Sequence, residues 1–191
     1  MIKTLYPTFR HWSERGGVYI ISDTHFEDSD CKLMDENWIT PEEHISNINR
    51  IVHKNDTLIH LGDVGNPEWM KKIKAYKVLI TGNHDRGVSY YEEYFDEIYD
   101  GPLFVANKLL LSHEPVFLEF AFNIHGHDHN KMAKRDGMHL NCASNVVGYE
   151  PINLANVIKE GVLSGISSIH RLTIDYASGR INKDEEKNVS M

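Results

Sequence analysis

Short apolar runs alternate with amphipathic stretches along most of the chain. Five of these runs are three to five residues long, as buried strands are, and each leads directly into polar residues. They cover residues 18–21, 57–61, 77–80, 109–111 and 122–124. Such alternation is typical of a layered α/β fold, in which helices cover a sheet.

The segments between the runs carry signals for helices. Thr40, Pro41 and Glu43 supply an N-cap, a first-turn proline and a capping-box acid, and apolar residues then recur at helical spacing up to Val52. We predict further helices after the Asn66-Pro67 pair, from 89 to 99, and from Asn153 to just before residue 161. Residues 168–176 are predicted to form a late strand near a sheet edge.

The residues that follow the five strands are of a few polar types. In open α/β sheets ligands bind outside the carboxyl ends of the strands, so we expect these residues at one edge. They are Asp23, His25, Asp63, Asn83, His84, His113, His127 and His129. Imidazole, carboxylate and amide groups together suit Mn, Fe, Zn or a similar divalent ion, but not a Ca²⁺ cage or a thiolate site. Asp63 is the natural carboxylate to bridge two such ions.

Glycines stand beside these motifs, at positions 62, 82 and 126. Glycine lets the backbone turn sharply or approach another segment closely, so we expect tight loops around the ligands. His60, His125 and His139 are interpreted as hydrogen-bonded structural histidines, because the ligand positions are already filled.

The motifs occur in the order Asp-x-His, Gly-Asp, Gly-Asn-His-Asp, a lone His and Gly-His-x-His. This order resembles the calcineurin-like metallophosphoesterase superfamily, and most closely its small bacterial and phage-type phosphohydrolases. The resemblance runs from about Val18 to the Pro151-Ile152 region. It implies a β-sandwich flanked by helices, a four-layer α/β/β/α arrangement, with a dinuclear metal site at the carboxyl ends of the strands.

The resemblance also implies a role for each motif residue. Asp23, His25 and His129 would hold one metal ion, Asn83, His113 and His127 would hold the other, and Asp63 would bridge them. His84 matches the catalytic histidine, which contacts the substrate phosphate together with the ligand Asn83 and helps the leaving group depart. Asp85 would orient His84 or support the loop. Arg86, just after the motif, is a candidate donor to a phosphate oxygen, and a partner in a surface ion pair is its equally weighted alternative role.

These residues predict hydrolysis of a small phosphate ester, with a diester slightly preferred over a monoester. Two ions about 3.5–4 Å apart can hold a water molecule as hydroxide and clamp the phosphoryl oxygens, so no Ser or Cys nucleophile is needed. A nuclease is one alternative, but the formal charge of −8 argues against general affinity for nucleic acid. A non-enzymatic metal-binding interaction module is the other, and the presence of His84 weighs against it.

The remaining features concern organisation. We expect one domain over residues 1–182 and a polar tail over 183–191. The two cysteines are too few for a disulfide framework, and no apolar stretch approaches the roughly 18 residues of a membrane span. Together with the lack of a signal-peptide pattern, this predicts a cytoplasmic protein without a membrane partner. The oligomeric state stays open.

Two surface features had competing interpretations. The acidic connection over residues 26–37 is expected to be a solvated loop, and the alternative is a loop that borders the site and disfavours highly charged substrates. The aromatic residues over 90–99 follow helical spacing, so we expect them to be core residues rather than a platform for stacking bases.

Overall fold

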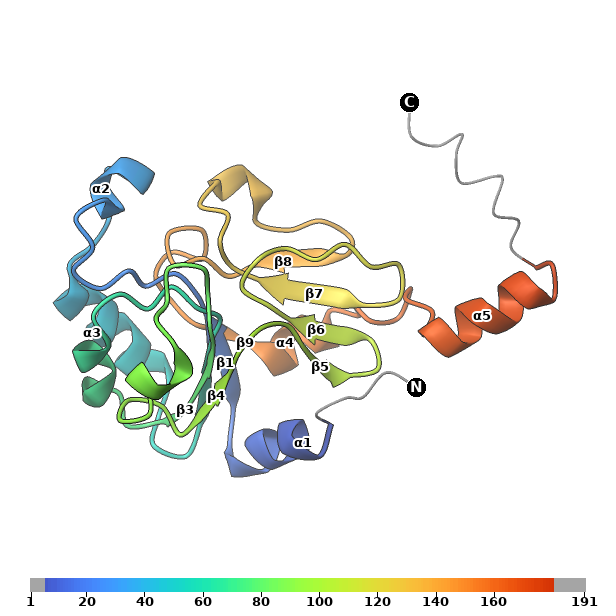
Figure 1. Ribbon diagram of the computed structural model, residues 1–191, viewed down its shortest axis with the longest axis horizontal. Coiled ribbons are helices and arrows are strands. Elements are labelled where there is room, and N and C mark those ends of the chain that lie inside the picture. Colours follow the sequence, from blue (N-terminus) through green and yellow to red (C-terminus); the bar gives the residue numbers. More distant parts are fainter. Residues whose placement is uncertain (1–5, 181–191) are drawn as a thin grey trace.

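The computed structural model of the chain describes residues 6–180. Two β-sheets lie against each other, and helices flank them (Figure 1). The first sheet has the order β4-β3-β2-β1-β9, with β1 at Val18–Ile21, β2 at Thr57–His60, β3 at Tyr76–Ile80, β4 at Glu97–Tyr99 and β9 at Ile152–Asn153. The second has the order β5-β6-β7-β8, with β5 at Leu103–Ala106, β6 at Leu109–Leu111, β7 at Phe122–His125 and β8 at His139–Asn141.

The described residues also form short α-helices and 3₁₀ helices. The α-helices are α1 at Tyr6–Arg15, α2 at Cys31–Met34, α3 at Pro41–Ile51, α4 at Leu154–Lys159 and α5 at Ile169–Ala177. The 3₁₀ helices are η1 at Pro67–Lys72, η2 at Val88–Tyr90 and η3 at Lys131–Ala133. Figure 1 shows α3 beside the first sheet and α5 extending away from both sheets.

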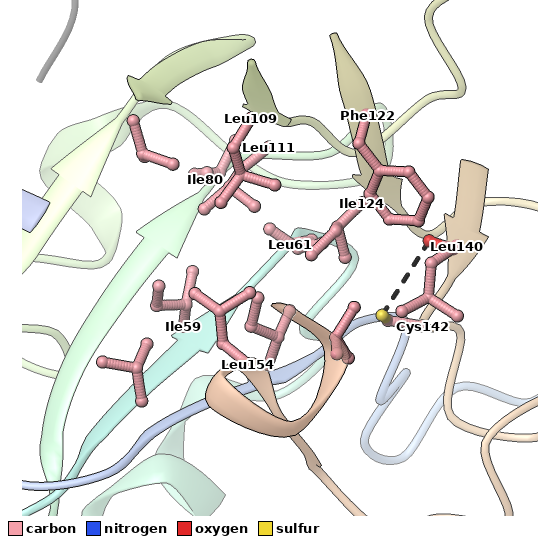
Figure 2. Close-up of a cluster of buried hydrophobic side chains, with 14 of the residues drawn as sticks. Ile59, Leu61, Ile80, Leu109, Leu111, Phe122, Ile124, Leu140, Cys142 and Leu154 are labelled. Atoms are coloured by element: carbon pink, nitrogen blue, oxygen red, sulfur yellow. Dashed lines mark hydrogen bonds between the residues drawn. The ribbon is translucent and has the colours of Figure 1, made fainter. Parts of the chain in front are cut away.

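The main hydrophobic core lies between the two sheets (Figure 2). Alternate residues of β1, β2 and β3 face it, including Ile20, Ile59 and Ile80, each of which is fully buried. Leu111 and Ile124 enter the same core from the second sheet. The period-two alternation of a strand places every second side chain on this face, so the sandwich follows from the pattern of the apolar runs.

The intervening residues of the first sheet face a second core under α3. Leu58 and Leu79 pack there against Ile45 and Ile48 of the helix. The capping box is present, because Thr40 accepts from the backbone of Glu43 and the Glu43 side chain accepts from the backbone of Thr40. Both faces of the first sheet are thus buried, which explains why its strands read as continuous apolar runs.

Parallel pairing brings the carboxyl ends of the central strands to one edge. β1, β2, β3 and β4 are parallel neighbours, and so are β6, β7 and β8. Ser22 joins the sheets at this edge, because its N–H donates to Cys142 and its carbonyl accepts from Ser144. The predicted fold of two sheets flanked by helices is confirmed, and so is the helix that begins after Asn153.

Three predicted elements differ from the structure. Residues 89–99 form η2, turns and β4 rather than one helix, because Glu97–Tyr99 adds to the first sheet as a parallel neighbour of β3. Residues 168–176 belong to α5 rather than a strand: Ser168 caps the helix, and Arg171 pairs with Asp175 one turn later. The helix after Asn66 is the 3₁₀ helix η1.

Among the other expectations, the tail over residues 183–191 lies outside the described residues. The aromatic segment is mixed: Tyr91 and Phe95 are buried, whereas Tyr90 is exposed. Cys31 and Cys142 are both buried and unpaired. Burial raises the pKa of the Cys31 thiol to about 12, which keeps it in the weakly nucleophilic protonated form.

Candidate metal centre

Three side chains from the ends of β1 and β7 converge as a first group of donors. The atoms of Asp23, His25 and His129 that could bind a metal lie within 4.8 Å of one another. Oδ1 of Asp23 is 3.9 Å from Nε2 of His25 and 3.7 Å from Nε2 of His129. Donor atoms about 2.0–2.2 Å from one ion can lie up to about 4.4 Å apart, so these distances suit a shared cation.

A second group stands beside the first. Asp63, His113 and His127 offer donor atoms within the same 4.8 Å limit. Asn83 joins them, because its Oδ1 is 2.8 Å from Nε2 of His113 and 3.1 Å from Nδ1 of His127. The sequence-predicted ligands are therefore all brought together, in the two sets that the motif order implied.

One atom faces both groups. Oδ2 of Asp63 is 3.7 Å from Nε2 of His25 in the first group and 3.3 Å from Nε2 of His113 in the second. The other oxygen, Oδ1, accepts from the backbone N–H of His84 at 2.9 Å. The carboxylate is thus held by one oxygen while the other points between the two groups.

Further hydrogen bonds orient the imidazoles. Nδ1 of His113 lies 2.8 Å from the carbonyl of Leu61, so it carries the proton and leaves a lone pair on Nε2. Nδ1 of His129 likewise faces Oδ1 of Asn145 at 3.0 Å, and Nδ1 of His25 faces Asp28 at 3.2 Å. Each Nε2 is then free to accept a cation, as in other metal sites whose histidines are fixed from behind.

Two buried donor atoms without hydrogen-bond partners also support the binding of a divalent cation. Oδ1 of Asp23 and Nε2 of His25 are buried and have no hydrogen-bond partner in the described part of the chain. Buried polar atoms are usually paired, and an orphaned pair of acceptors facing each other calls for a positive ion between them.

The charges of the site point the same way. Burial raises the pKa of Asp23. Burial alone would raise the pKa of Asp63 as well, but the neighbouring His113 outweighs it and lowers the pKa to about 2. For His113, burial acts to lower the pKa, but Asp63 and Asp23 raise it to about 9. The two carboxylates therefore favour positive charge between the donor groups.

The backbone is strained where the ligands stand. Asp23, His25, Asp63 and His127 all have positive φ angles, between 41° and 66°. Residues other than glycine seldom adopt this left-handed region, and such outliers cluster at functional sites. The turn at each strand end thereby aims the ligand side chain back over the edge of the sheet.

Two glycines allow the loops to approach the ligands. A Cβ added at Gly126 would lie 2.1 Å from Oγ of Ser22 and 2.2 Å from Oδ2 of Asp23. At Gly82 it would lie 2.3 Å from Oδ1 of Asp63. Neither position has room for a side chain, which confirms the close approach expected from the sequence.

The Gly-Asn-His-Asp loop carries the residues predicted to act on the substrate. The exposed imidazole of His84 lies 5.9 Å from that of His25 between ring centroids. Asp85 accepts from the backbone N–H groups of Gly82, Asp63 and Val64 and from the hydroxyl of Tyr91. These bonds tie two ligand loops together. The structure thus favours loop support over the alternative in which Asp85 orients His84.

The guanidinium of Arg86 lies 4.5 Å from the centre of the Tyr90 ring, a cation–π contact. Arg86 forms no ion pair within the described residues, so the alternative role in a surface ion pair is not supported there. Its contact with a phosphate remains a prediction.

The structure corrects the expectation that the acidic connection is a solvated loop. Residues 26–37 are not a plain solvated loop, since they contain α2 and border the ligands. Asp28 contacts His25, and Asp35 is buried, where it pairs with Lys131 at 2.5 Å and accepts from the hydroxyl of Tyr149 at 3.3 Å. Burying the Asp35 carboxylate is possible because both partners satisfy it.

Sequence reasoning missed two residues around the ligands. The Trp38 ring lies 6.0 Å from His25 and 5.7 Å from His129 between centroids, and Asn145 holds His129 from behind. Neither residue stands in a motif, so no local pattern marks them. Asp28 did carry a signal, since it follows His25 by three residues and both lie in one turn.

The three histidines interpreted as structural, His60, His125 and His139, make hydrogen bonds as expected. Nδ1 of His60 accepts from Gly62 N–H at 3.2 Å, and Nε2 bonds the hydroxyl of Thr24 at 3.0 Å. Nδ1 of His125 bonds the carbonyl of Gly126, and Nδ1 of His139 contacts Asp136. The first two brace the glycine turns beside the ligands.

Among the described residues, no helix has the length and apolar character to cross a bilayer.

None of the curated proteins compared with the chain matches it. Two solved structures are similar to it. A protein of unknown function from Aquifex aeolicus is 26% identical, with a TM-score of 0.63, over 75% of this chain and 98% of its own. A nuclease from Pseudomonas putida is 25% identical, with a TM-score of 0.45, over 61% of this chain and 62% of its own.

A family profile also matches the sequence. It describes the calcineurin-like phosphoesterase superfamily domain and aligns with residues 17–147. These residues run from the start of β1 past Asn145, and they include every donor of both groups. With more than half of its length matched, the chain belongs to the calcineurin-like phosphoesterase superfamily.

Proposed function

We propose that the protein hydrolyses phosphate esters in a metal-dependent reaction, with a slight preference for diesters. The observation that carries the proposal is the pair of donor groups joined through one oxygen of Asp63. Membership of a phosphoesterase superfamily supports the reaction class. The donor chemistry supports Mn, Fe, Zn or a similar ion at each group.

In this proposal each group holds one ion. The first would be held by Asp23, His25 and His129, the second by Asn83, His113 and His127, and Asp63 would bridge them. When bound, two such ions activate water and neutralise charge on the phosphoryl oxygens.

The chain's own residues then have distinct tasks. His84 is not needed as a ligand, because the seven others already provide each group with four side chains when Asp63 is shared. Its exposed imidazole lies beside the first group, where it can donate a proton to the oxygen of the leaving group. Asp85 holds the backbone of Gly82 and Asp63 in place. Asn83 and Arg86 complete the predicted contacts with the phosphate.

His84 and Asn83 are both exposed, so the site is open and should accept varied esters, and the slight preference for a diester stays a prediction from the sequence. Extended nucleic acid is not the substrate we propose, since the formal net charge is −8. A cytoplasmic location remains a prediction from the sequence.

Hydrolysis of an activated aryl diester tests the proposal. Stringent chelation should abolish turnover, and Mn²⁺ or a similar ion should restore it. Asp23→Asn is the control that shows whether the metal acts at this site. It replaces a carboxylate of the first group with a neutral amide of the same shape, and so weakens the binding of metal by that group. Full turnover by protein shown to be metal-free would contradict the mechanism, whereas a preference for monoesters would reverse only the choice of diester.

A further inference from the structure

A cavity of about 200 Å³ adjoins the first donor group. It lies between the chain that follows β1, helix α2 and the start of α3. His25 and Trp38 line it, and the same two side chains contact each other and border the donor group. The cavity therefore shares a wall with the candidate metal centre. Of the proposed metal ligands, only His25 lines it.

The cavity contains an unpaired buried histidine. His44, at the start of α3, is 1% exposed, and its Nε2 has no hydrogen-bond partner in the described part of the chain. Its ring packs against Phe26 and Tyr149, with centroids 5.4 and 5.5 Å apart. Nε2 is itself buried, so the ring of His44, and not this nitrogen, is what a group in the cavity can meet.

The charges around the cavity disfavour an anion. Burial lowers the pKa of His44 to about 3, so the ring is neutral. The lining includes two acidic residues, Glu27 and Asp28, and one basic residue, Lys32. The ammonium group of Lys32 already donates to the carbonyls of Glu36 and Trp38, at 3.3 and 2.6 Å.

The walls and the size describe what the cavity can accept. Phe26, Cys31 and Trp38 supply buried apolar surface, two of them as aromatic rings. A water molecule occupies about 30 Å³ of the liquid, so the volume is that of a small group of waters and lies below the 300 Å³ or more typical of complete ligand sites. A single ring fits such a space, and aromatic walls favour edge or offset contacts with it.

We propose that this cavity binds an uncharged aromatic substituent of the phosphate ester, packed against the rings of Phe26 and Trp38. The inference rests on the proposed function, which places the phosphate at the neighbouring metal centre. It narrows the substrates to singly phosphorylated esters that carry a ring, and it excludes those whose substituent bears a second phosphate.

Two phosphonates test the proposal without requiring turnover. Calorimetry on the Mn²⁺-loaded protein would compare phenylphosphonate with methylphosphonate, which differ only in the ring. Even one methylene in an apolar pocket changes affinity by about tenfold or more, so phenylphosphonate should bind at least about tenfold more tightly. Ile39→Trp, which fills the cavity from its lining, should remove this advantage. Leu33→Trp, at a position 85% exposed on α2, should keep it.

A second measurement uses the metal-free chain. Phenol added to labelled protein should shift the NMR signals of the His44 ring in the parent and in Leu33→Trp, but not in Ile39→Trp. Unshifted His44 signals in the parent, or a phenyl advantage that survives in Ile39→Trp, would overturn the proposal. Absence of hydrolysis together with both expected results would instead reject the proposed function and leave the cavity as a ring-binding site.

Discussion

Asp85→Asn is the substitution that best tests how the ligand loops are held. The two oxygens of Asp85 divide their work: Oδ2 accepts from the N–H groups of Gly82 and Asp63, each at 2.8 Å, and Oδ1 accepts from Val64 N–H at 3.0 Å and the Tyr91 hydroxyl at 2.8 Å. An asparagine keeps the shape of the side chain but replaces one oxygen with a donor.

The loss can be worked out bond by bond. The least costly orientation places the amide nitrogen in the position of Oδ1, where the Tyr91 hydroxyl can rotate to accept from it. The N–H of Val64 is then left facing a donor, which costs about 1–3 kcal/mol. The three remaining bonds lose the charge of the carboxylate, at about 1 kcal/mol each. Because such terms are not additive, we expect a total loss of about 3–5 kcal/mol in the free energy of unfolding.

Denaturant unfolding of the metal-free protein measures this loss, with the slope checked to ensure that the denatured state is unchanged. Tyr91→Phe is the matched control, since it removes one of the four bonds and should cost about 1 kcal/mol. A loss below about 1 kcal/mol for Asp85→Asn would show that the carboxylate does not organise the loops. Metal affinity should fall in parallel, because Asp63 and Asn83 lie on the loops that Asp85 joins.

Three further predictions concern single side chains. Asp63→Asn should reduce the metal content of both groups, measured by elemental analysis, and full double occupancy would remove Asp63 from its bridging role. His84→Ala should keep both metals yet lower turnover by about a hundredfold, most with poor leaving groups; equal rates across a leaving-group series would make His84 structural. His44 is neutral in the folded chain, with a pKa lowered to about 3 by burial, whereas its pKa when unfolded is near 6.5. The unfolded chain therefore binds the extra proton, and stability should fall as the pH drops below about 6.5, by about 1 kcal/mol per unit until His44 itself titrates. Acid unfolding of His44→Leu should lack this part of the slope, and an unchanged slope would contradict the assignment.

The candidate ligands could be found from the sequence because short strands and the residues at their ends are local features. Each apolar run predicted a strand, and the residue types after Ile21, His60 and Ile80 predicted the chemistry before any contact was known. Parallel topology then required these ends to meet. One local pattern and one general rule were enough to bring these side chains together, and their roles as metal ligands stay a prediction.

The failures depended on long-range contacts. Residues 97–99 formed part of a helical pattern, but pairing with β3 and the hydrogen bonds of Glu97 with Trp12 and Tyr76 made them a strand. Tertiary contacts of this kind override local propensity. The support of His129 by Asn145 and the buried pairing of Asp35 with Lys131 join segments distant in sequence, and no spacing in one chain reveals them.

The left-handed backbone at Asp23, His25, Asp63 and His127 has a consequence for the side chains that it carries. Each such residue stores about 1–3 kcal/mol of strain, which the surrounding fold must offset. Glycine would relieve that strain, but at Asp23 and Asp63 it would also remove carboxylates that accept from the N–H groups of His127 and His84. These bonds offset part of the strain, so each carboxylate helps to hold the backbone that presents it.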